Sequence, residues 1–312
     1  MSRVRLAFLG SGRFAVPSLQ ALISAGHDVA ALVTQPDRES GRGRALTPPP
    51  TKPVALAHGI LVQQPRRIRQ PEAVAALAAV QPEALVVVAY GQILPRAVLD
   101  LAPRGAFNVH ASLLPRYRGA APIQWAIARG ESQTGVTTMQ LDEGLDTGPI
   151  LMARATPIGP LETAGELEGR LAGIGAELLL ETLDGLASGR LQPRPQDHAL
   201  ATLAPILRKE DGRVDWSRPA SEIGWRVRGF HPWPGATAAW QGQGLKLLRV
   251  AEAPPGPGAP GEILEAGPSG VLVGCGGGTR LWLAEVQPES RRAMPASAWA
   301  AGARLRPGGR LA

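Results

Sequence analysis

The stretch Val4-Arg5-Leu6-Ala7-Phe8-Leu9-Gly10-Ser11-Gly12-Arg13-Phe14-Ala15 places an apolar run directly before a glycine turn. We expect residues 4–9 to form a buried strand and residues 17–25 to form a helix that ends at Gly26. Similar apolar runs predict strands at residues 28–34, 84–89 and 106–110, and an alternating segment predicts one at residues 135–141. Helices are expected between and after them, at residues 71–80, 123–129 and 164–186. Strands that alternate with helices predict an α/β domain with a Rossmann-like, mainly parallel sheet.

The composition of the chain changes after residue 208. Residues 1–189 are predicted to be the Rossmann-like domain, and residues 190–208, which lose periodicity, are predicted to be a linker. Six of the seven tryptophans come after residue 208, among short β-like segments that glycine- and proline-rich turns separate. This pattern predicts a smaller C-terminal β-barrel, similar to an OB fold, over residues 209–312.

The overall composition is typical of a globular protein, with 44% hydrophobic and 19% charged residues among 312. No apolar run is long enough to span a bilayer, and the single cysteine, Cys275, allows no intrachain disulfide. A cytoplasmic location is the simplest interpretation. The net charge of +7 suits a polyanionic partner such as a nucleic acid. The region from residue 209 onward is only mildly positive, with 13 basic and 9 acidic residues.

Gly10, Gly12 and Ala15 match the relaxed pattern G-x-G-x-x-A, which dinucleotide-binding proteins place after their first strand. A nicotinamide-dependent dehydrogenase also needs an acidic residue at the end of the second strand to bind the ribose. Here the acid, Asp37, comes after Pro36 and leads into a basic loop. We therefore favour a tight β–α turn without a dinucleotide, and the dehydrogenase stays as an alternative.

Residues 34–50 are predicted to be a long connection without regular structure. Such connections are usually functional or disordered. Arg38, Arg42 and Arg44 lie beside glycines here, so their guanidinium groups can follow a phosphate backbone. A solvated loop without a ligand is the alternative interpretation.

Asn108 and His110 lie two residues apart at the end of a predicted strand, and Asp146 follows in a glycine-flanked loop. Residues two apart on a strand point to the same face. An amide, an imidazole and a carboxylate can together handle the charge that develops at a carbonyl carbon. The other histidines show no metal-ligand spacing, the G-x-S-x-G pattern is absent, and Cys275 has no obvious base nearby. The sequence therefore favours direct transfer without a covalent intermediate, and it predicts no metal.

The segment Asn108-Val109-His110-Ala111-Ser112-Leu113-Leu114-Pro115-Arg116-Tyr117-Arg118-Gly119 resembles the signature of the folate-dependent formyltransferases. Leu145-Asp146-Thr147-Gly148 is similar to their aspartate loop. Within that superfamily the resemblance is greatest to the methionyl-tRNA formyltransferases, because of four further stretches. These are Thr34-Gln35-Pro36-Asp37 with Gly41-Arg42-Gly43, Ala89-Tyr90-Gly91-Gln92-Ile93-Leu94-Pro95, Gly119-Ala120-Ala121-Pro122-Ile123-Gln124 and Pro232-Trp233-Pro234-Gly235. The chain departs from that family at Ser11-Gly12, where Thr-Pro is usual, and at His231, where Asn is usual.

The resemblance implies transfer of the formyl group of 10-formyltetrahydrofolate to the α-amino group of initiator methionyl-tRNA, through a tetrahedral intermediate. It implies catalytic roles for Asn108, His110 and Asp146, and it implies a monomer. The residues implied to bind the folate are Ser112, Leu113, Leu114, Pro115, Tyr90, Gly91, Ile93 and Leu94. The residues implied to bind tRNA are Arg38, Arg42 and Arg44, of which Arg42 is the foremost contact.

Two alternatives to this function stay open beside the dehydrogenase. One is a formyltransferase that acts on a small amine, such as a purine precursor or an amino sugar. Such an enzyme should lack both the arginine loop and the tryptophan-rich second domain. The other is a non-catalytic RNA-binding protein with an inactive folate pocket, against which the intact set of Asn108, His110 and Asp146 argues.

Overall fold

The computed structural model describes residues 3–40 and 45–312. The chain divides into two compact units. The first unit comprises Met1–Pro122, Gln133–Pro157 and Glu168–Pro205, and the second comprises Ile123–Ser132, Ile158–Leu167 and Ile206–Ala312. The predicted domains at residues 1–189 and 209–312, with a linker between them, remain a proposal.

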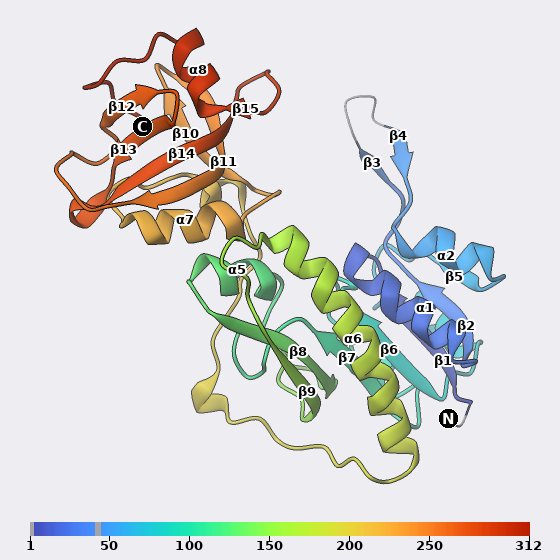
Figure 1. Cartoon of the computed structure of the whole chain (residues 1–312). Helices are drawn as coiled ribbons and strands as arrows, with labels where there is room; N and C mark the ends of the chain where they lie inside the picture. Colours follow the sequence, from blue (N-terminus) through green and yellow to red (C-terminus); the bar gives the residue numbers. More distant parts are fainter. Residues whose placement is uncertain (1–2, 41–44) are drawn as a thin grey trace. The chain divides into compact units, whose positions relative to one another are not determined.

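A seven-stranded sheet forms the centre of the first unit within the described residues (Figure 1). Its strands, in order across the sheet, are β5 (Leu61–Gln63), β2 (Asp28–Val33), β1 (Arg5–Gly10), β6 (Ala84–Val88), β7 (Ala106–His110), β8 (Gln133–Gln140) and β9 (Ile150–Pro157). The first five run parallel, and β8 is antiparallel to both of its neighbours. The prediction of a mainly parallel sheet is confirmed. The sequence pattern misses β5, which has three residues, and β9, of which only Leu151 is buried.

Helices pack on both faces of this sheet. On one face, α3 (Pro71–Ala78) and α4 (Arg96–Leu99) contribute Leu77 and Val98 to a buried cluster that includes Leu85 and Ala106 of the sheet. On the other face, α6 (Ala164–Ala187) approaches β7 so closely that a Cβ on Gly175 would lie 2.9 Å from Val109 Cγ1. A further helix of this unit, α1 (Val16–Ser24), follows the first glycine turn.

The start of α6 is fixed by its own sequence. The side chain of Thr163 accepts a hydrogen bond from the Glu166 N–H at 3.4 Å, and the Glu166 carboxylate accepts one from the Thr163 N–H at 2.9 Å. This reciprocal pair is a capping box, which satisfies backbone donors that the first turn leaves unpaired. The hydrogen bonds from Thr163 hold the pKa of Glu166 below its ordinary value.

The alternation of β7 decides where the polar side chains at its end point. Val109 faces α6, so Asn108 and His110 point to the opposite side, which they share with Ala106. Both residues lie at the carboxyl end of the strand. The fold therefore places an amide and an imidazole together at the edge where open α/β sheets bind ligands.

The connection at residues 34–50 is expected from its sequence to lack regular structure, but it contains two short strands. β3 (Arg38–Ser40) pairs with β4 (Ala45–Thr47) as an antiparallel hairpin, and α2 (Thr51–Ala57) follows. The expectation is wrong because pairing across the hairpin, with Arg38 opposite Thr47, orders strands of three residues that carry no apolar alternation of their own.

The second unit is built on an antiparallel sheet. Its strands, in order, are β10 (Ala236–Trp240), β11 (Gln243–Ala253), β14 (Arg280–Pro288), β13 (Gly270–Gly274) and β12 (Ile263–Gly267), with β15 (Met294–Pro295) beside β14. Its core unites Ile223 of α7 (Ala220–Gly229), Val286 of the sheet and Trp299 of α8 (Ala296–Gly302). The predicted smaller C-terminal domain of β-strands is confirmed, and the strands of its sheet pair antiparallel.

Another helix of the second unit, α5 (Pro122–Ala128), meets α7 at a glycine. A Cβ on Gly229 would lie 2.7 Å from the Ala128 backbone nitrogen, so the two helices approach at a distance that only glycine allows. Among all the described residues, no helix combines the length and the apolar character that a membrane crossing requires.

Candidate active site

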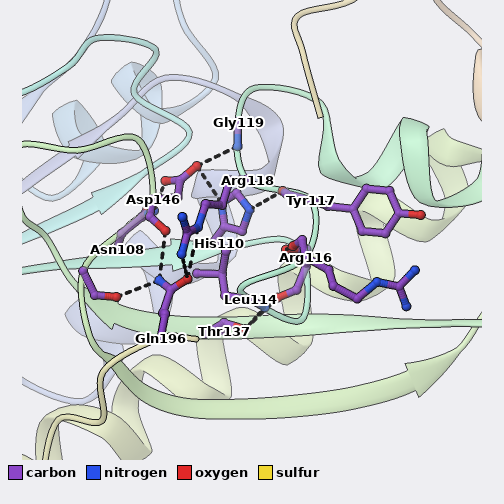
Figure 2. A network of polar contacts seen from close by, with 12 residues as sticks. Asn108, His110, Leu114, Arg116, Tyr117, Arg118, Gly119, Thr137, Asp146 and Gln196 are labelled. Carbon is purple, nitrogen blue, oxygen red and sulfur yellow. Dashed lines mark hydrogen bonds and ion pairs between the residues drawn. The ribbon is translucent and has the colours of Figure 1, made fainter. Parts of the chain in front are cut away.

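The structure brings Asn108, His110 and Asp146 together (Figure 2). Asn108 Nδ2 lies 3.4 Å from Asp146 Oδ1, and His110 Nδ1 lies 3.6 Å from Asp146 Oδ2. Asp146 comes from the loop between β8 and β9, 38 positions after Asn108. His110 is buried, and Asn108 is half-buried. The three side chains form one polar cluster, in which the Asn108 amide remains partly exposed.

The other ring nitrogen of His110 has a different partner. Nε2 lies 2.9 Å from the backbone carbonyl oxygen of Tyr117. A carbonyl can only accept a hydrogen bond, so Nε2 carries the proton. Nδ1 is therefore the nitrogen left to exchange a proton, and it faces Asp146. The Tyr117 carbonyl fixes the tautomer, a role that the sequence does not indicate.

The loop that carries Asp146 has an unusual backbone. Asp146 itself has φ of 53°, in the left-handed region that residues other than glycine rarely adopt. Its Oδ2 accepts a hydrogen bond of 2.8 Å from the Gly119 N–H. A Cβ on Gly148 would lie 1.9 Å from the Gln140 carbonyl oxygen, so only glycine fits there. The glycines around Asp146 thus permit the turn that aims its carboxylate at β7.

Residues 194–204, which belong to the predicted linker, run along both loops of the site. Arg194 exchanges two backbone hydrogen bonds of 2.8 Å with Ile150, just after the Asp146 loop. Thr202 accepts from the Arg118 N–H through its carbonyl oxygen at 2.8 Å, and its hydroxyl accepts from the Tyr117 N–H at the same distance. This segment has little regular secondary structure, but it is part of the site and not a free connection.

Arg118 and Gln196 meet beneath the Asp146 loop, and both are buried (Figure 2). Arg118 donates from Nε at 3.1 Å and from Nη2 at 2.6 Å to Gln196 Oε1. Arg118 Nη2 also lies 3.2 Å from His198 Nδ1, which accepts because a guanidinium can only donate. Neither Gln196 nor a role for Arg118 is predicted from the sequence. Gln196 sits in a polar, proline-rich stretch that carries no signal of burial.

The predicted folate-binding segment at residues 112–115 is held from below by Thr137 of β8. Thr137 Oγ1 donates to the Ser112 carbonyl oxygen at 2.7 Å and accepts from the Leu114 N–H at 3.1 Å. The Ser112 hydroxyl is buried and donates to the Arg116 carbonyl oxygen at 2.6 Å. Ser112 and Leu114 therefore shape the loop, whereas Leu113 and Pro115 are half-buried.

The second predicted folate-binding segment, residues 90–94, alternates between core and surface. Tyr90 and Leu94 are buried, and burial raises the pKa of the Tyr90 hydroxyl to about 12. Gly91 is exposed with φ of 79°, and Ile93 is 73% exposed. Of the four predicted residues in this segment, Gly91 and Ile93 are therefore the accessible ones.

Of the predicted tRNA-binding residues, Arg38 is exposed at the start of the β3–β4 hairpin, while Arg42 and Arg44 lie outside the described residues. The base of the hairpin is anchored at Asp37. Lys52 Nζ lies 2.8 Å from Asp37 Oδ2, and Gln64 Nε2 donates to Asp37 Oδ1 at 2.7 Å. The hydrogen bonds from Gln64 and Lys52 hold the pKa of Asp37 below its ordinary value.

The first glycine turn is occupied by contacts within the protein. Ser11 Oγ accepts from the Gln35 N–H at 2.9 Å and from Thr34 Oγ1 at 3.1 Å. Thr51 Oγ1 donates to the Gly10 carbonyl oxygen at 2.8 Å. These bonds join the ends of β1 and β2, which fits the interpretation of Gly10-Ser11-Gly12 as a tight turn.

Cys275 belongs to the core of the second unit and is buried. Burial raises the pKa of its thiol to about 12, so the nucleophilic thiolate is rare near neutral pH.

Comparison with known proteins identifies a family that covers both units. Residues 4–183 match the formyl transferase family, and residues 206–304 match the formyl transferase C-terminal domain. A methionyl-tRNA formyltransferase of Citrifermentans bemidjiense is 52% identical over 311 residues, which cover 100% of this chain and 97% of that protein. One of Anaeromyxobacter dehalogenans is 53% identical over 307 residues, covering 96% and 97%. The chain belongs to the methionyl-tRNA formyltransferase family.

Distantly related solved structures share the fold of this methionyl-tRNA formyltransferase family member. HypX from Aquifex aeolicus in complex with tetrahydrofolic acid has a TM-score of 0.65 at 19% identity, covering 96% of this chain and 47% of that one. An N-formyltransferase from Helicobacter canadensis, in complex with folinic acid and dTDP-3-aminofucose, has a TM-score of 0.66 at 16% identity, covering 91% and 99%. The family resemblance inferred from the segment around Asn108 and His110 is confirmed.

Proposed function

We propose that the chain transfers the formyl group of 10-formyltetrahydrofolate to the α-amino group of methionyl-tRNA, for the initiation of translation. The convergence of Asn108, His110 and Asp146 is the observation that carries this function. A donor for an oxyanion, an imidazole and a carboxylate are the groups that direct acyl transfer between two nitrogens requires. Membership of the family supports the identity of the formyl donor and of the acceptor.

In the proposed reaction the α-amino nitrogen attacks the formyl carbon, and the formyl oxygen becomes a tetrahedral oxyanion. Asn108 donates a side-chain N–H to this oxygen. Its amide has two N–H groups, and because one faces Asp146 Oδ1 the orientation of the other is restricted. Negative charge on the oxygen grows as the intermediate forms, so the amide stabilises the transition state more than the bound substrate.

The proton follows a path through the other two residues. The attacking nitrogen loses a proton, and folate N10 gains one as its bond to the formyl carbon breaks. Asp146 accepts the proton directly or through one water, and His110 Nδ1, which faces Asp146, exchanges it. The net reaction moves a formyl group to the amine and a proton to the folate, without a covalent bond to the protein.

The folate is proposed to bind over the loop at residues 112–115 and the segment at residues 90–94. Leu113, Pro115 and Ile93 are the accessible apolar side chains there, and apolar walls suit a flat aromatic ring. Ser112, Leu114, Tyr90 and Leu94 are proposed to support these contacts from the buried side.

The tRNA is proposed to contact Arg38, Arg42 and Arg44 of the β3–β4 hairpin. Its phosphate backbone is also proposed to contact the second unit. Replacing Arg42 by alanine should raise KM for methionyl-tRNA and leave KM for the folate unchanged. Arg66→Ala, at another exposed arginine, is the matched control. Equal rises in both KM values would show that the arginine only maintains the loop.

The choice of acceptor is tested by offering the chain several amines. Purified protein is incubated with 10-formyltetrahydrofolate and either charged initiator tRNA, an amino sugar nucleotide or a purine precursor amine, and the formylated product is identified by mass spectrometry. Formyl-methionine released from the tRNA supports the proposal, and formylation of only a small amine refutes it. A tRNA acceptor would place the reaction in the cytoplasm. We also propose that the protein is a monomer.

A further inference from the structure

The side-chain amide of Gln196 uses its whole hydrogen-bonding capacity at the site. Nε2 donates to the carbonyl oxygens of Asp146 at 2.9 Å and Gly148 at 2.7 Å. Oε1 accepts from Arg118 Nε and Nη2. Gln196 is only 6% exposed, although its four neighbours on each side, residues 192–195 and 197–200, are exposed. Its burial therefore reflects these specific contacts and not a generally buried segment.

The two carbonyls that Gln196 holds belong to the turn that aims Asp146. A left-handed backbone at a residue other than glycine is strained and persists only where the surroundings impose it. Asp146 has such a backbone, with φ of 53°. The hydrogen bonds from Gln196 fix the peptide groups after Asp146 and after Gly148, and so they fix the direction of the Asp146 side chain.

Arg118 in turn decides which way the Gln196 amide faces. A guanidinium can only donate, so it must meet the oxygen of the amide and not the nitrogen. The nitrogen is thereby directed at the two carbonyls. The neighbours of Arg118 in the chain also hold the site: the Tyr117 carbonyl binds His110, and the Gly119 N–H binds Asp146.

We propose that Gln196, oriented by Arg118, is a positioning residue that holds Asp146 in its reactive direction. The proposal rests on the proposed formyl transfer, because Asp146 is taken to move the proton of that reaction. Gln196 itself does not contact the reacting atoms; it acts through the backbone of Asp146 and Gly148.

The Gln196→Glu variant removes the N–H donors of the side chain but keeps its acceptor oxygen. A carboxylate still accepts from Arg118, but it cannot donate to the carbonyls of Asp146 and Gly148. We expect kcat to fall by about 10- to 100-fold, as misplacement of a reacting group does, with KM for both substrates unchanged. Gln192→Glu makes the same charge change at an exposed glutamine of the same segment and should behave as wild type. An unchanged kcat in Gln196→Glu would overturn the proposal.

A double-mutant cycle asks whether Gln196 acts through Asp146. In the Asp146→Asn background the second change, Gln196→Glu, should lower the remaining kcat far less than it does in wild type, because residues of one unit are not additive. Full additivity would mean that Gln196 acts elsewhere. If the Gln196→Glu variant does not fold, the same cycle is measured with Gln196→Met, whose side chain has no N–H group and no charge.

Hydrogen exchange of the Gly119 amide gives a readout that needs no substrate. This N–H donates to Asp146 Oδ2 in the wild type, so it should exchange faster in Gln196→Met if the carboxylate has moved, and not in Gln192→Met. If wild type fails to formylate methionyl-tRNA, the proposed function fails while this measurement still judges the positioning role. Unchanged exchange at Gly119 would refute that role.

Discussion

The Nε2 atom of His110 lies 2.9 Å from the carbonyl oxygen of Tyr117. This contact assigns the two ring nitrogens to different tasks. The carbonyl holds a proton on Nε2, so Nδ1, which faces Asp146 at 3.6 Å, is the ring nitrogen that would exchange a proton in the proposed reaction. Tyr117 makes this contact through its backbone carbonyl, so replacing its side chain should leave the tautomer of His110 unchanged.

Replacing His110 by alanine removes the proposed proton exchange. The expected loss in kcat is about 100- to 10,000-fold, the range typical of general acid–base catalysis, while binding of tRNA persists. Steady-state kinetics with each substrate varied, and a filter-binding measurement with charged tRNA, check the two expectations. His58→Ala, at an exposed histidine, is the matched control and should keep full activity. Full activity in His110→Ala would refute the assigned role.

Replacing Asn108 by alanine removes the proposed oxyanion donor. We expect kcat to fall by about 100- to 1,000-fold, with little change in KM for the folate, because the donor acts in the transition state. Measured kcat and KM values for the variant decide the matter. A rise in KM at constant kcat would instead show that Asn108 only binds the ground-state formyl group.

The glycines of α6 provide a test of how closely this helix packs on β7. Gly173 is exposed, with open space where a Cβ would lie, so Gly173→Ala should stabilise the protein by about 0.5–1 kcal/mol. Gly175 is buried, and its Cβ would lie 2.9 Å from Val109 Cγ1, between Asn108 and His110 in sequence. Gly175→Ala should therefore lose this gain and lower kcat. Thermal unfolding and activity of the matched pair check both expectations; equal stabilisation by the two changes would contradict the packing.

The buried His27 should make the free energy of unfolding depend on pH. Its side chain is buried, and burial lowers its pKa from 6.5. Its Nδ1 accepts from the Val4 N–H at 3.4 Å, whereas its Nε2 has no hydrogen-bond partner within residues 3–40 and 45–312. Below pH 6.5 the unfolded chain binds this proton more readily than the folded chain, so the stability present above 6.5 is lost as the pH falls.

Urea unfolding at a series of pH values measures this contribution. His27→Gln keeps an acceptor for the Val4 N–H but cannot titrate, so its stability should fall less steeply than that of wild type between neutral and mildly acidic pH. His58→Gln should follow the wild-type curve. Parallel curves for wild type and His27→Gln would show that another group causes the loss.

The parts of the fold that the sequence predicts are those with a strong local signal. The apolar runs of β1, β6 and β7 stand out because these strands are buried on both faces. The spacing of Asn108 and His110 follows from the two-residue period of a strand. β9 escapes prediction because one of its faces is open, and the β3–β4 hairpin because long-range pairing and not composition orders it.

The rest of the site could not be predicted because it depends on loops that meet only in the folded chain. The contact of His110 with Tyr117 is made by a backbone carbonyl, which leaves no mark in the sequence. Gln196 lies 50 positions from Asp146 in a stretch with linker composition, and only the fold brings them together. Arg118 lies within the family signature, but nothing in the pattern indicates that it is buried and paired with an amide.

The most direct test of the account is the single-turnover rate of formyl-methionyl-tRNA formation by wild type and Asp146→Asn. Both proteins are mixed, in excess over charged initiator tRNA, with saturating 10-formyltetrahydrofolate, and formyl-methionine is measured after deacylation. The account predicts rapid transfer by wild type and a rate at least about 100-fold lower in the variant, with both substrates still bound. Absence of transfer by wild type, or an equal rate in Asp146→Asn, would contradict it.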